Sequence, residues 1–257
     1  MSFHLWRTVC WLIPAIAVYT IVLGTLSLGS SLFGGHGHFA HWCARAWSWL
    51  ILVTTGVRVE VRGLDRLTPG ATYVFVANHQ SIYDIPVLFA SLPFQLRIIA
   101  KESLGRFPFL GWHLRRTGHM LVDRRRPDRH GIFRWATSLP SRGLSLIVFP
   151  EGTRSRHGLV APFKAGSFFP AVQTGIPIVP LSVVGSRHVM RKGELTTRPG
   201  DVVLVVHPPV TTVTDPDPSP ETMRELAARI CEIVRPPVDA EAASVPRATP
   251  PADGRAS

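Results

Sequence analysis

The sequence predicts one α/β domain, a mixed sheet flanked by helices, preceded by an N-terminal membrane-anchoring helical segment. Residues 1–56 are strongly apolar, and Arg7 and Arg45 are their only formal charges. From Val57 onward, short runs rich in Val, Ile and Leu alternate with helix-length segments, which is typical of α/β domains. A length of 257 residues suits one such domain with appendages. We therefore predict an anchor over residues 1–56, a globular domain over 57–234 and a disordered tail over 235–257.

The first apolar run extends from Val9 to Phe33 without a formally charged residue. It exceeds the about 20 residues that cross a bilayer core, and membrane helices tolerate Pro14 and the glycines within it. A signal peptide is the alternative, because Arg7 precedes the run. The run is long for a signal peptide and lacks a clear cleavage site, so we predict a retained anchor.

A second apolar segment, from Ala46 to Val57, contains Trp47 and Trp49. It is too short to cross a membrane comfortably, and tryptophan favours the lipid–water interface. An interfacial helix or a re-entrant hairpin with the first run fits this pattern, and a buried core helix fits it equally well.

The domain contains seven β-like runs rich in β-branched and aliphatic residues. They are Val57–Val61, Tyr73–Ala77, Arg97–Ala100, Met120–Val122, Leu144–Phe149, Ile178–Val184 and Val202–His207. Helices are predicted between or after them at Asp84–Ser91, His130–Ser138, Ala165–Thr174 and Glu221–Val234. From Arg235 onward Pro, Ala and charged residues dominate, which predicts the disordered tail.

The net charge of +11 favours polyanionic partners. Without a nucleic-acid-binding motif, and beside an apolar segment, anionic lipid is the more economical partner than nucleic acid. The three cysteines are isolated, and the histidines lack a ligand pattern with Cys or carboxylates, so we predict neither a disulfide framework nor a metal site.

A histidine and an aspartate follow the second predicted strand, at His79 and Asp84. If His79 lies in the turn and Asp84 in the first turn of the next helix, the carboxylate can accept the Nδ1 proton and leave Nε2 as a base. A helix-capping aspartate and a histidine bonded within a loop are the structural alternative.

A glycine and two charged residues follow the fifth strand, at Glu151, Gly152 and Arg154. Gly152 allows close backbone approach to a ligand, and a guanidinium can grip a phosphate through two parallel hydrogen bonds. Glu151 is suited to orienting an arginine or bonding an acceptor hydroxyl. A turn with a surface Arg–Glu pair is the alternative.

A basic cluster follows the fourth strand, where Asp123 and Arg124 precede Arg125, Arg126 and Arg129. One arginine is suited to a substrate phosphate and the others to lipid headgroups. For the last three, a solvated basic loop is the preferred interpretation.

Together these segments resemble the glycerolipid acyltransferase family that includes 1-acylglycerol-3-phosphate acyltransferase. The N-H-x-x-x-x-D motif matches Asn78, His79 and Asp84, and the Asp-Arg motif matches Asp123 and Arg124. The third motif, F-P-E-G-T-R-S, matches in full at Phe149-Pro150-Glu151-Gly152-Thr153-Arg154-Ser155. An apolar run with a central proline, Ile178-Val179-Pro180-Leu181, resembles the fourth. Motifs in register over roughly residues 57 to 210 are strong evidence.

The resemblance implies acyl transfer to the sn-2 hydroxyl of lysophosphatidic acid, which gives phosphatidic acid in phospholipid synthesis. His79 would be the general base, oriented by Asp84, and Lys101 is a candidate for stabilising the thioester oxyanion. Lys101 as a surface charge is nearly as plausible. The acceptor would be held by Arg124, Glu151, Gly152, Thr153 and Arg154.

The implied donor is acyl-CoA or acyl-carrier protein, used as a co-substrate, and no cofactor or metal is expected. The implied location is a membrane, expected to be a bacterial inner membrane with the domain on the cytoplasmic side. Other acceptors remain open: a lyso-ornithine lipid, another lysophospholipid or glycerol 3-phosphate. A hydrolase and a non-catalytic membrane-binding protein are further alternatives, although no G-x-S-x-G turn is present.

Overall fold

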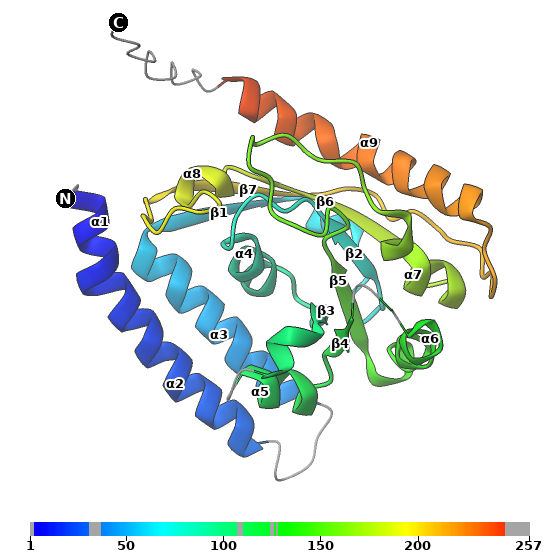
Figure 1. Cartoon of the computed structure of the whole chain (residues 1–257), viewed down its shortest axis with the longest axis horizontal. Helices are drawn as coiled ribbons and strands as arrows, with labels where there is room; N and C mark the ends of the chain where they lie inside the picture. The colour runs from blue at the N-terminus through cyan, green and yellow to red at the C-terminus, as the bar shows by residue number, and fades with distance from the viewer. Residues whose placement is uncertain (1–2, 31–36, 107–109, 124–125, 127, 245–257) are drawn as a thin grey trace, which may run out of the picture.

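One seven-stranded sheet runs through the molecule, with helices on both faces (Figure 1). The computed structural model describes residues 3–30, 37–106, 110–123, 126 and 128–244. The sheet is parallel except where its sixth and seventh strands pair, so the predicted fold class, a mixed sheet flanked by helices, is confirmed.

All seven predicted strands are present, with ends shifted by a few residues. They are β1 (Val57–Arg62), β2 (Val74–Ala77), β3 (Gln95–Lys101), β4 (Met120–Val122), β5 (Leu144–Val148), β6 (Ile178–Val184) and β7 (Gly200–Val206). Their order across the sheet is β1-β7-β6-β2-β5-β3-β4.

The helices lie before, between and after the strands. They are α1 (Phe3–Arg7), α2 (Ile13–Ser30), α3 (His38–Thr55), α4 (Asp84–Ser91), α5 (Leu110–Arg116), α6 (Arg129–Thr137), α7 (Phe169–Thr174), α8 (Ser186–Val189) and α9 (Pro220–Ser244). A π-helical turn, Thr8–Leu12, joins α1 to α2. Short 3-10 turns lie at Leu64–Arg66, Glu102–Arg106, Pro140–Arg142 and Ala165–Phe168.

The core has two halves, one on each face of the sheet. Along β2, Phe75 and Ala77 belong to the half that α3 and α4 cover. Val74 and Val76 belong to the half that α7 and α9 cover. Side chains alternate between the faces of a strand, so a central strand buried on both sides must be apolar throughout, as β2 is.

The N-terminal helices form a hairpin that lies outside α4 (Figure 1). Arg7 Nη2 donates to the Thr55 carbonyl at 2.7 Å, and Trp47 Nε1 donates to the Thr20 hydroxyl at 3.0 Å. The second apolar segment, predicted at 46–57, is therefore part of the longer helix α3. One face of α3 contributes to the core and another packs on α2, so the core-helix interpretation holds in part, and the placement of this segment at a lipid interface stays a prediction.

Helix α9 is longer than predicted. We expected the helix to end at Val234 and disorder to begin at Arg235, but α9 continues through two prolines to Ser244. Val234 and Val238 are buried in the core, and Asp239 accepts a hydrogen bond from the Val160 amide at 3.0 Å. This packing offsets the helix-breaking tendency of proline. Residues 245–257 of the predicted tail lie outside the described residues.

Candidate active site

The motif residues gather at one edge of the sheet. Strands β2, β3, β4, β5 and β6 run in the same direction, so their carboxyl ends share that edge. His79 follows β2, Glu151 follows β5 and Lys101 ends β3. Ligand sites of open α/β sheets lie outside the carboxyl ends of the strands.

His79 and Asp84 form a hydrogen-bonded pair in the turn between β2 and α4. Their Nδ1 and Oδ2 atoms are 2.8 Å apart. The same carboxylate oxygen accepts from the backbone amides of Gln80 and Ser81, at 2.8 and 2.9 Å. A carboxylate can only accept, so Nδ1 carries the proton and Nε2 has a lone pair for a substrate proton.

The pair combines a buried carboxylate with a partly exposed imidazole. The Asp84 side chain is completely buried, whereas 17% of the His79 side chain is exposed. Asn78 anchors the turn to β6 through two hydrogen bonds with the Val183 backbone, at 2.7 and 2.9 Å. The Phe149 ring stacks on the imidazole at a centroid distance of 4.3 Å. These contacts restrict the orientation of His79 before any substrate arrives.

Glu151 links this turn to a second loop. Its Oε1 accepts from the His79 amide at 2.7 Å and its Oε2 from the Ala161 amide at 3.1 Å. The residue is only 4% exposed, and its burial raises the pKa of the carboxyl group. Both carboxylate oxygens therefore bond to the backbone, an arrangement that sequence reasoning missed because it requires contacts far apart in the chain.

The turn after Glu151 presents groups suited to an anion. Gly152 has a φ of 72°, in the left-handed region that favours glycine, and the mobile end of the Lys164 side chain lies beside it, 2.8 Å from where a Cβ would be. Arg154 is half-buried, and its guanidinium has no hydrogen-bond or ion-pair partner within the described parts of the chain. The Ser155 amide donates to the His79 carbonyl at 2.8 Å, which fixes this turn beside the base.

Lys192 is a further residue that the sequence analysis missed. Its ammonium group donates to the Thr153 hydroxyl at 2.8 Å and to the Arg154 carbonyl at 2.9 Å. No motif contains Lys192, and no signal in the sequence indicated this contact.

Lys101 is a predicted site residue that is not joined to this cluster. Lys101 lies at the same edge but on β3, two strands away from β2, and is exposed. No hydrogen bond connects it to His79 within the described residues. Arg124 lies outside the described residues. Their proposed roles stay predictions.

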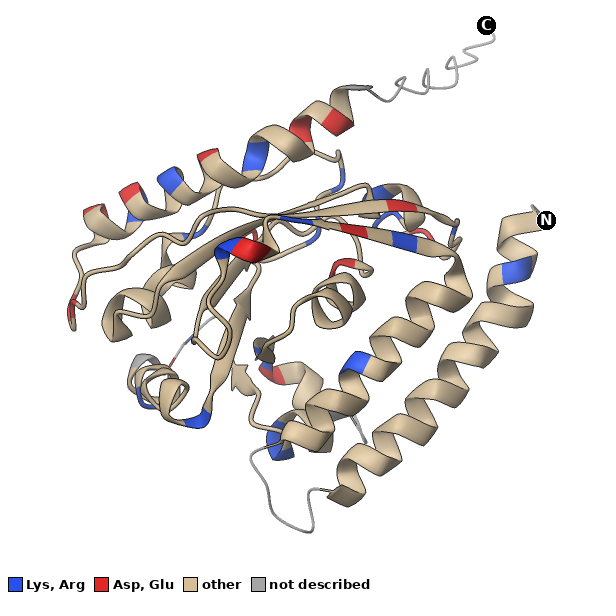
Figure 2. Cartoon of the chain, turned by 180° about the vertical axis from the view of Figure 1, so that it is seen from behind, with Lys and Arg blue, Asp and Glu red and all other residues tan. Residues whose placement is uncertain are grey.

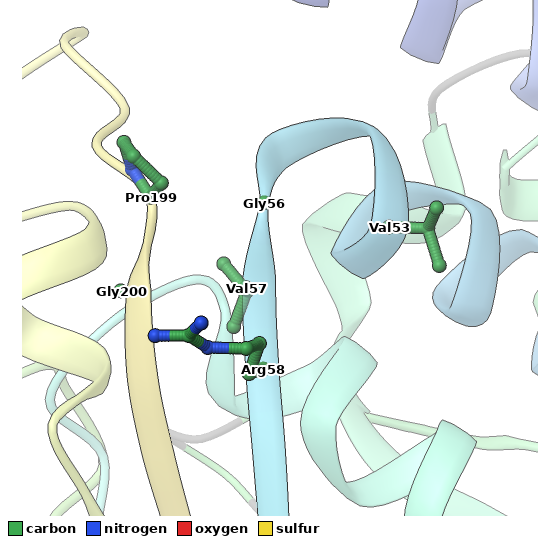
Figure 3. A pocket seen from close by; sticks show the side chains of 6 residues that line it. All are labelled: Val53, Gly56, Val57, Arg58, Pro199 and Gly200. Carbon is green, nitrogen blue, oxygen red and sulfur yellow. The ribbon is translucent and has the colours of Figure 1, made fainter.

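An open groove lies at the same edge of the sheet, beside β1 and β7 (Figure 3). Its lining residues are Val53, Gly56, Val57, Arg58, Pro199 and Gly200. None of the predicted site residues lines it, and the Arg58 guanidinium is bound to the Asp201 carboxylate at 2.7 Å. The groove therefore shares no residue with the cluster around His79 and Glu151.

The described part of the chain contains no group of three or more His, Cys, Asp or Glu side chains arranged to hold a metal ion. Cys10, Cys43 and Cys231 are free cysteines.

Comparison with known proteins supports an acyltransferase assignment. The model of the Acyltransferase family matches residues 58–184. A chloroplastic 1-acyl-sn-glycerol-3-phosphate acyltransferase of Brassica napus is 34% identical over 175 residues, which cover 67% of this chain and 50% of that protein. The alpha form of the Mus musculus enzyme is 37% identical over 160 residues, 61% of this chain and 56% of that protein.

The fold also has a close structural counterpart. The crystal structure of the 1-acyl-sn-glycerophosphate acyltransferase PlsC from Thermotoga maritima superposes with a TM-score of 0.65 at 28% identity. The superposition covers 85% of this chain and 92% of that one, whereas the chain spans about half the length of the curated relatives above. The chain thus belongs to the glycerolipid acyltransferase family that includes the 1-acyl-sn-glycerol-3-phosphate acyltransferases.

Proposed function

We propose that this protein transfers a fatty acyl group from acyl-CoA or acyl-carrier protein to the sn-2 hydroxyl of lysophosphatidic acid, giving phosphatidic acid. The observation that carries the proposal is the His79–Asp84 pair, 2.8 Å apart, at the edge of the sheet. The names of the relatives support the choice of acceptor. The chain spans about half the length of these relatives, and for that reason the donor and the acceptor are our proposals.

His79 acts as the general base in this reaction. Nε2 takes the proton of the acceptor hydroxyl as its oxygen attacks the thioester carbonyl carbon. The tetrahedral intermediate then expels the thiolate, the C–S bond breaks, and the imidazolium returns the proton to the sulfur. Asp84 stabilises the imidazolium through Nδ1, and general-base assistance contributes a factor of about 10²–10⁴ in rate. Lys101 is our candidate for stabilising the oxyanion.

The acceptor phosphate is bound on the turn after β5. Arg154 supplies an unengaged guanidinium and Thr153 a hydroxyl, and Gly152 places no side chain on the turn. We keep Arg124 as a second phosphate ligand. Glu151 contributes by holding the backbone, because one of its oxygens accepts from the His79 amide and the other from the Ala161 amide. The thioester is already activated, so the reaction requires no resident cofactor.

Both substrates carry acyl chains, and the N-terminal hairpin is suited to a lipid surface. Phe3–Ser30 is long and apolar enough to cross a membrane, and only 6% of its most apolar window is buried. Trp11 is 61% exposed and Trp49 58%. By contrast, α9 is amphipathic and alternates Lys or Arg with Asp or Glu on its outer face, whereas the hairpin is almost free of charge (Figure 2).

Exposed tryptophans on a nearly uncharged helical hairpin favour insertion into a bilayer over exposure to water. We propose that the hairpin holds the active site at the membrane surface. The cytoplasmic face of a bacterial inner membrane remains our prediction for the location.

The test is acyl transfer from labelled acyl-CoA to lysophosphatidic acid in mixed micelles, comparing wild type with His79→Ala. Labelled phosphatidic acid from the wild type alone supports both the reaction and the base. Equal activity of the two proteins would contradict the mechanism. Activity only with a lyso-ornithine lipid, another lysophospholipid or glycerol 3-phosphate would keep the chemistry and change the acceptor. Release of free fatty acid without transfer would indicate a hydrolase.

A further inference from the structure

The segment after β6 contacts both halves of the candidate active site. Ser81, in the turn of His79, donates through its hydroxyl to the Met190 carbonyl at 2.7 Å. Two residues later, Lys192 donates to Thr153 and to the Arg154 carbonyl at 2.8 and 2.9 Å. The match to the family model ends at residue 184, so these contacts come from outside the matched region.

The chemistry of an ammonium group determines what Thr153 can do. Lysine only donates hydrogen bonds, so Thr153 Oγ1 must accept the bond from Lys192. The hydroxyl proton of Thr153 is then left to be donated to another group. Together with the Arg154 guanidinium, this gives two side-chain donors on one turn, next to the positive charge of Lys192. Such a set is suited to a phosphate monoester.

The same turn is fixed to the base at its other end. The Ser155 amide donates to the His79 carbonyl at 2.8 Å, while Lys192 holds the Arg154 carbonyl. The distance between a phosphate bound at Arg154 and a hydroxyl bound at His79 is therefore set by two anchored points. In the acceptor, the phosphate and the reacting hydroxyl are separated by a fixed number of bonds, so this spacing governs whether the hydroxyl reaches Nε2.

We propose that Lys192 is a positioning residue, which holds the Thr153–Arg154 turn in the conformation that binds the acceptor phosphate. This inference rests on the proposed function, because it assumes an acceptor with a phosphate group. Lys192 acts through Thr153 and Arg154, and we do not place it in contact with the reacting atoms.

The kinetic test compares Lys192→Met, which keeps the apolar stem but removes the donors, with Lys192→Arg, which restores a cationic donor. Arg191→Met is the matched control, since Arg191 is exposed, its guanidinium lies 3.8 Å from the Glu194 carboxylate, and within the described residues no hydrogen bond joins its side chain to the turn. We expect Lys192→Met to raise KM for lysophosphatidic acid by about 10- to 100-fold, with kcat and the donor KM changed by less than about 3-fold. Lys192→Arg should recover most of this loss.

Three results would overturn the proposal in this assay. They are an unchanged KM for the acceptor in Lys192→Met, a loss confined to kcat, and an equal rise of KM in Arg191→Met. The last result would indicate attraction of anionic micelles by surface charge in general.

A second measurement does not depend on the substrate. Hydrogen exchange of the backbone amides of residues 153–156 should be faster in Lys192→Met than in wild type and unchanged in Arg191→Met, while β2 and β5 exchange equally in all three proteins. Identical exchange at 153–156 would overturn the proposal whatever the activity. If wild type makes no phosphatidic acid, the proposed function fails, and the exchange result still decides whether Lys192 holds this turn.

Discussion

The molecule contains two groups of histidine in opposite electrostatic surroundings. At the edge of the sheet, His79 lies beside the carboxylates of Asp84 and Glu151. On the face of the sheet that α3 covers, His41 and His119 lie near the Arg97 guanidinium. The two groups differ in burial as well as in charge: 17% of the His79 side chain is exposed and its neighbours are acidic, whereas His41 is 4% exposed and its neighbours are basic.

Burial, with a further contribution from the basic neighbours, lowers the pKa values of the second group of histidines. Arg97, on β3, is 1% exposed and donates to the Leu96 carbonyl at 2.8 Å. Burial, followed by the charge of Arg97, lowers the pKa of His41 to about 3 and the pKa of His119 well below its usual value. Burial also lowers the pKa of Arg97 itself, to about 10.

Exposure and neighbouring charge together separate His79, the proposed general base, from the buried histidines. A carboxylate at Nδ1 favours the imidazolium, which a general base must form during turnover. A nearby guanidinium disfavours the same species. Of the two groups, only His79 is therefore suited to taking a proton from a substrate.

The largest expected effect separates the two groups directly. His79→Ala should lower kcat/KM by about 10²–10⁴-fold, because the general base is lost. Its melting temperature should stay close to that of the wild type, since the side chain is partly exposed. His119→Ala should lower the melting temperature, because the Ile98 amide donates to His119 Nδ1 at 3.0 Å and would lose this acceptor. The activity of the folded His119→Ala protein should change little. A large loss of activity in folded His119→Ala would contradict the comparison.

The second expected effect tests the carboxylate partner. Asp84→Asn should lower kcat by about 10- to 100-fold, since a neutral amide stabilises the imidazolium less than a carboxylate does. The loss should be smaller than that of His79→Ala, because the imidazole remains. Asp217→Asn, in an exposed loop, is the control and should behave as wild type. Steady-state kinetics measure kcat for Asp84→Asn and for Asp217→Asn. An unaltered kcat in Asp84→Asn would remove Asp84 from the mechanism.

The third expected effect is a loss of stability in acid. His41 has a folded pKa of about 3 against an ordinary value of 6.5, so between these values the unfolded chain binds more protons than the folded one. Stability must therefore fall as the pH drops below 6.5, by about 2 kcal/mol from His41 alone at pH 5. Denaturant unfolding at several pH values measures this.

A variant isolates the contribution of His41 to that pH dependence. His41→Phe should make the curve less steep between pH 7 and pH 5, because the substituted side chain binds no proton, while His119 still contributes to the slope. His157→Gln, at an exposed position, should leave the slope unchanged. A slope unaffected by His41→Phe would assign the acid sensitivity to other groups.

The smallest expected effect concerns a third histidine near Arg97, His113, and its contact with the N-terminal hairpin. Ser27 Oγ and His113 Nδ1 are hydrogen-bonded at 2.9 Å, which joins α2 to α5. Ser27→Ala should lower the free energy of unfolding by about 1 kcal/mol without altering activity in micelles. Thr20→Val serves for comparison, since it removes the hydrogen bond that Trp47 Nε1 donates to Thr20 within the hairpin. A loss of activity in Ser27→Ala at constant stability would show that the hairpin acts on the site itself.

Local pattern was enough to predict several features from the sequence. The seven strands follow from runs of β-branched and aliphatic residues, and α4 was predicted with its observed ends, Asp84–Ser91. The pairing of His79 with Asp84 was also predictable, since a turn followed by a helix start brings residues five positions apart together. In each case the interaction partners are neighbours in the chain or share one strand.

Other features were decided only by tertiary contacts. Glu151 bonds to the amides of His79 and Ala161, and Lys192 reaches Thr153 across 39 positions of the chain. The extension of α9 past Pro236 depends on the burial of Val238 against the sheet. Hydrophobic periodicity and local turn chemistry act between residues close in sequence. For this reason the sequence by itself determined the strands, most helices and the family motifs. Which distant side chain satisfies a given donor depends on how the strands are ordered in the sheet, and only the folded structure decides that.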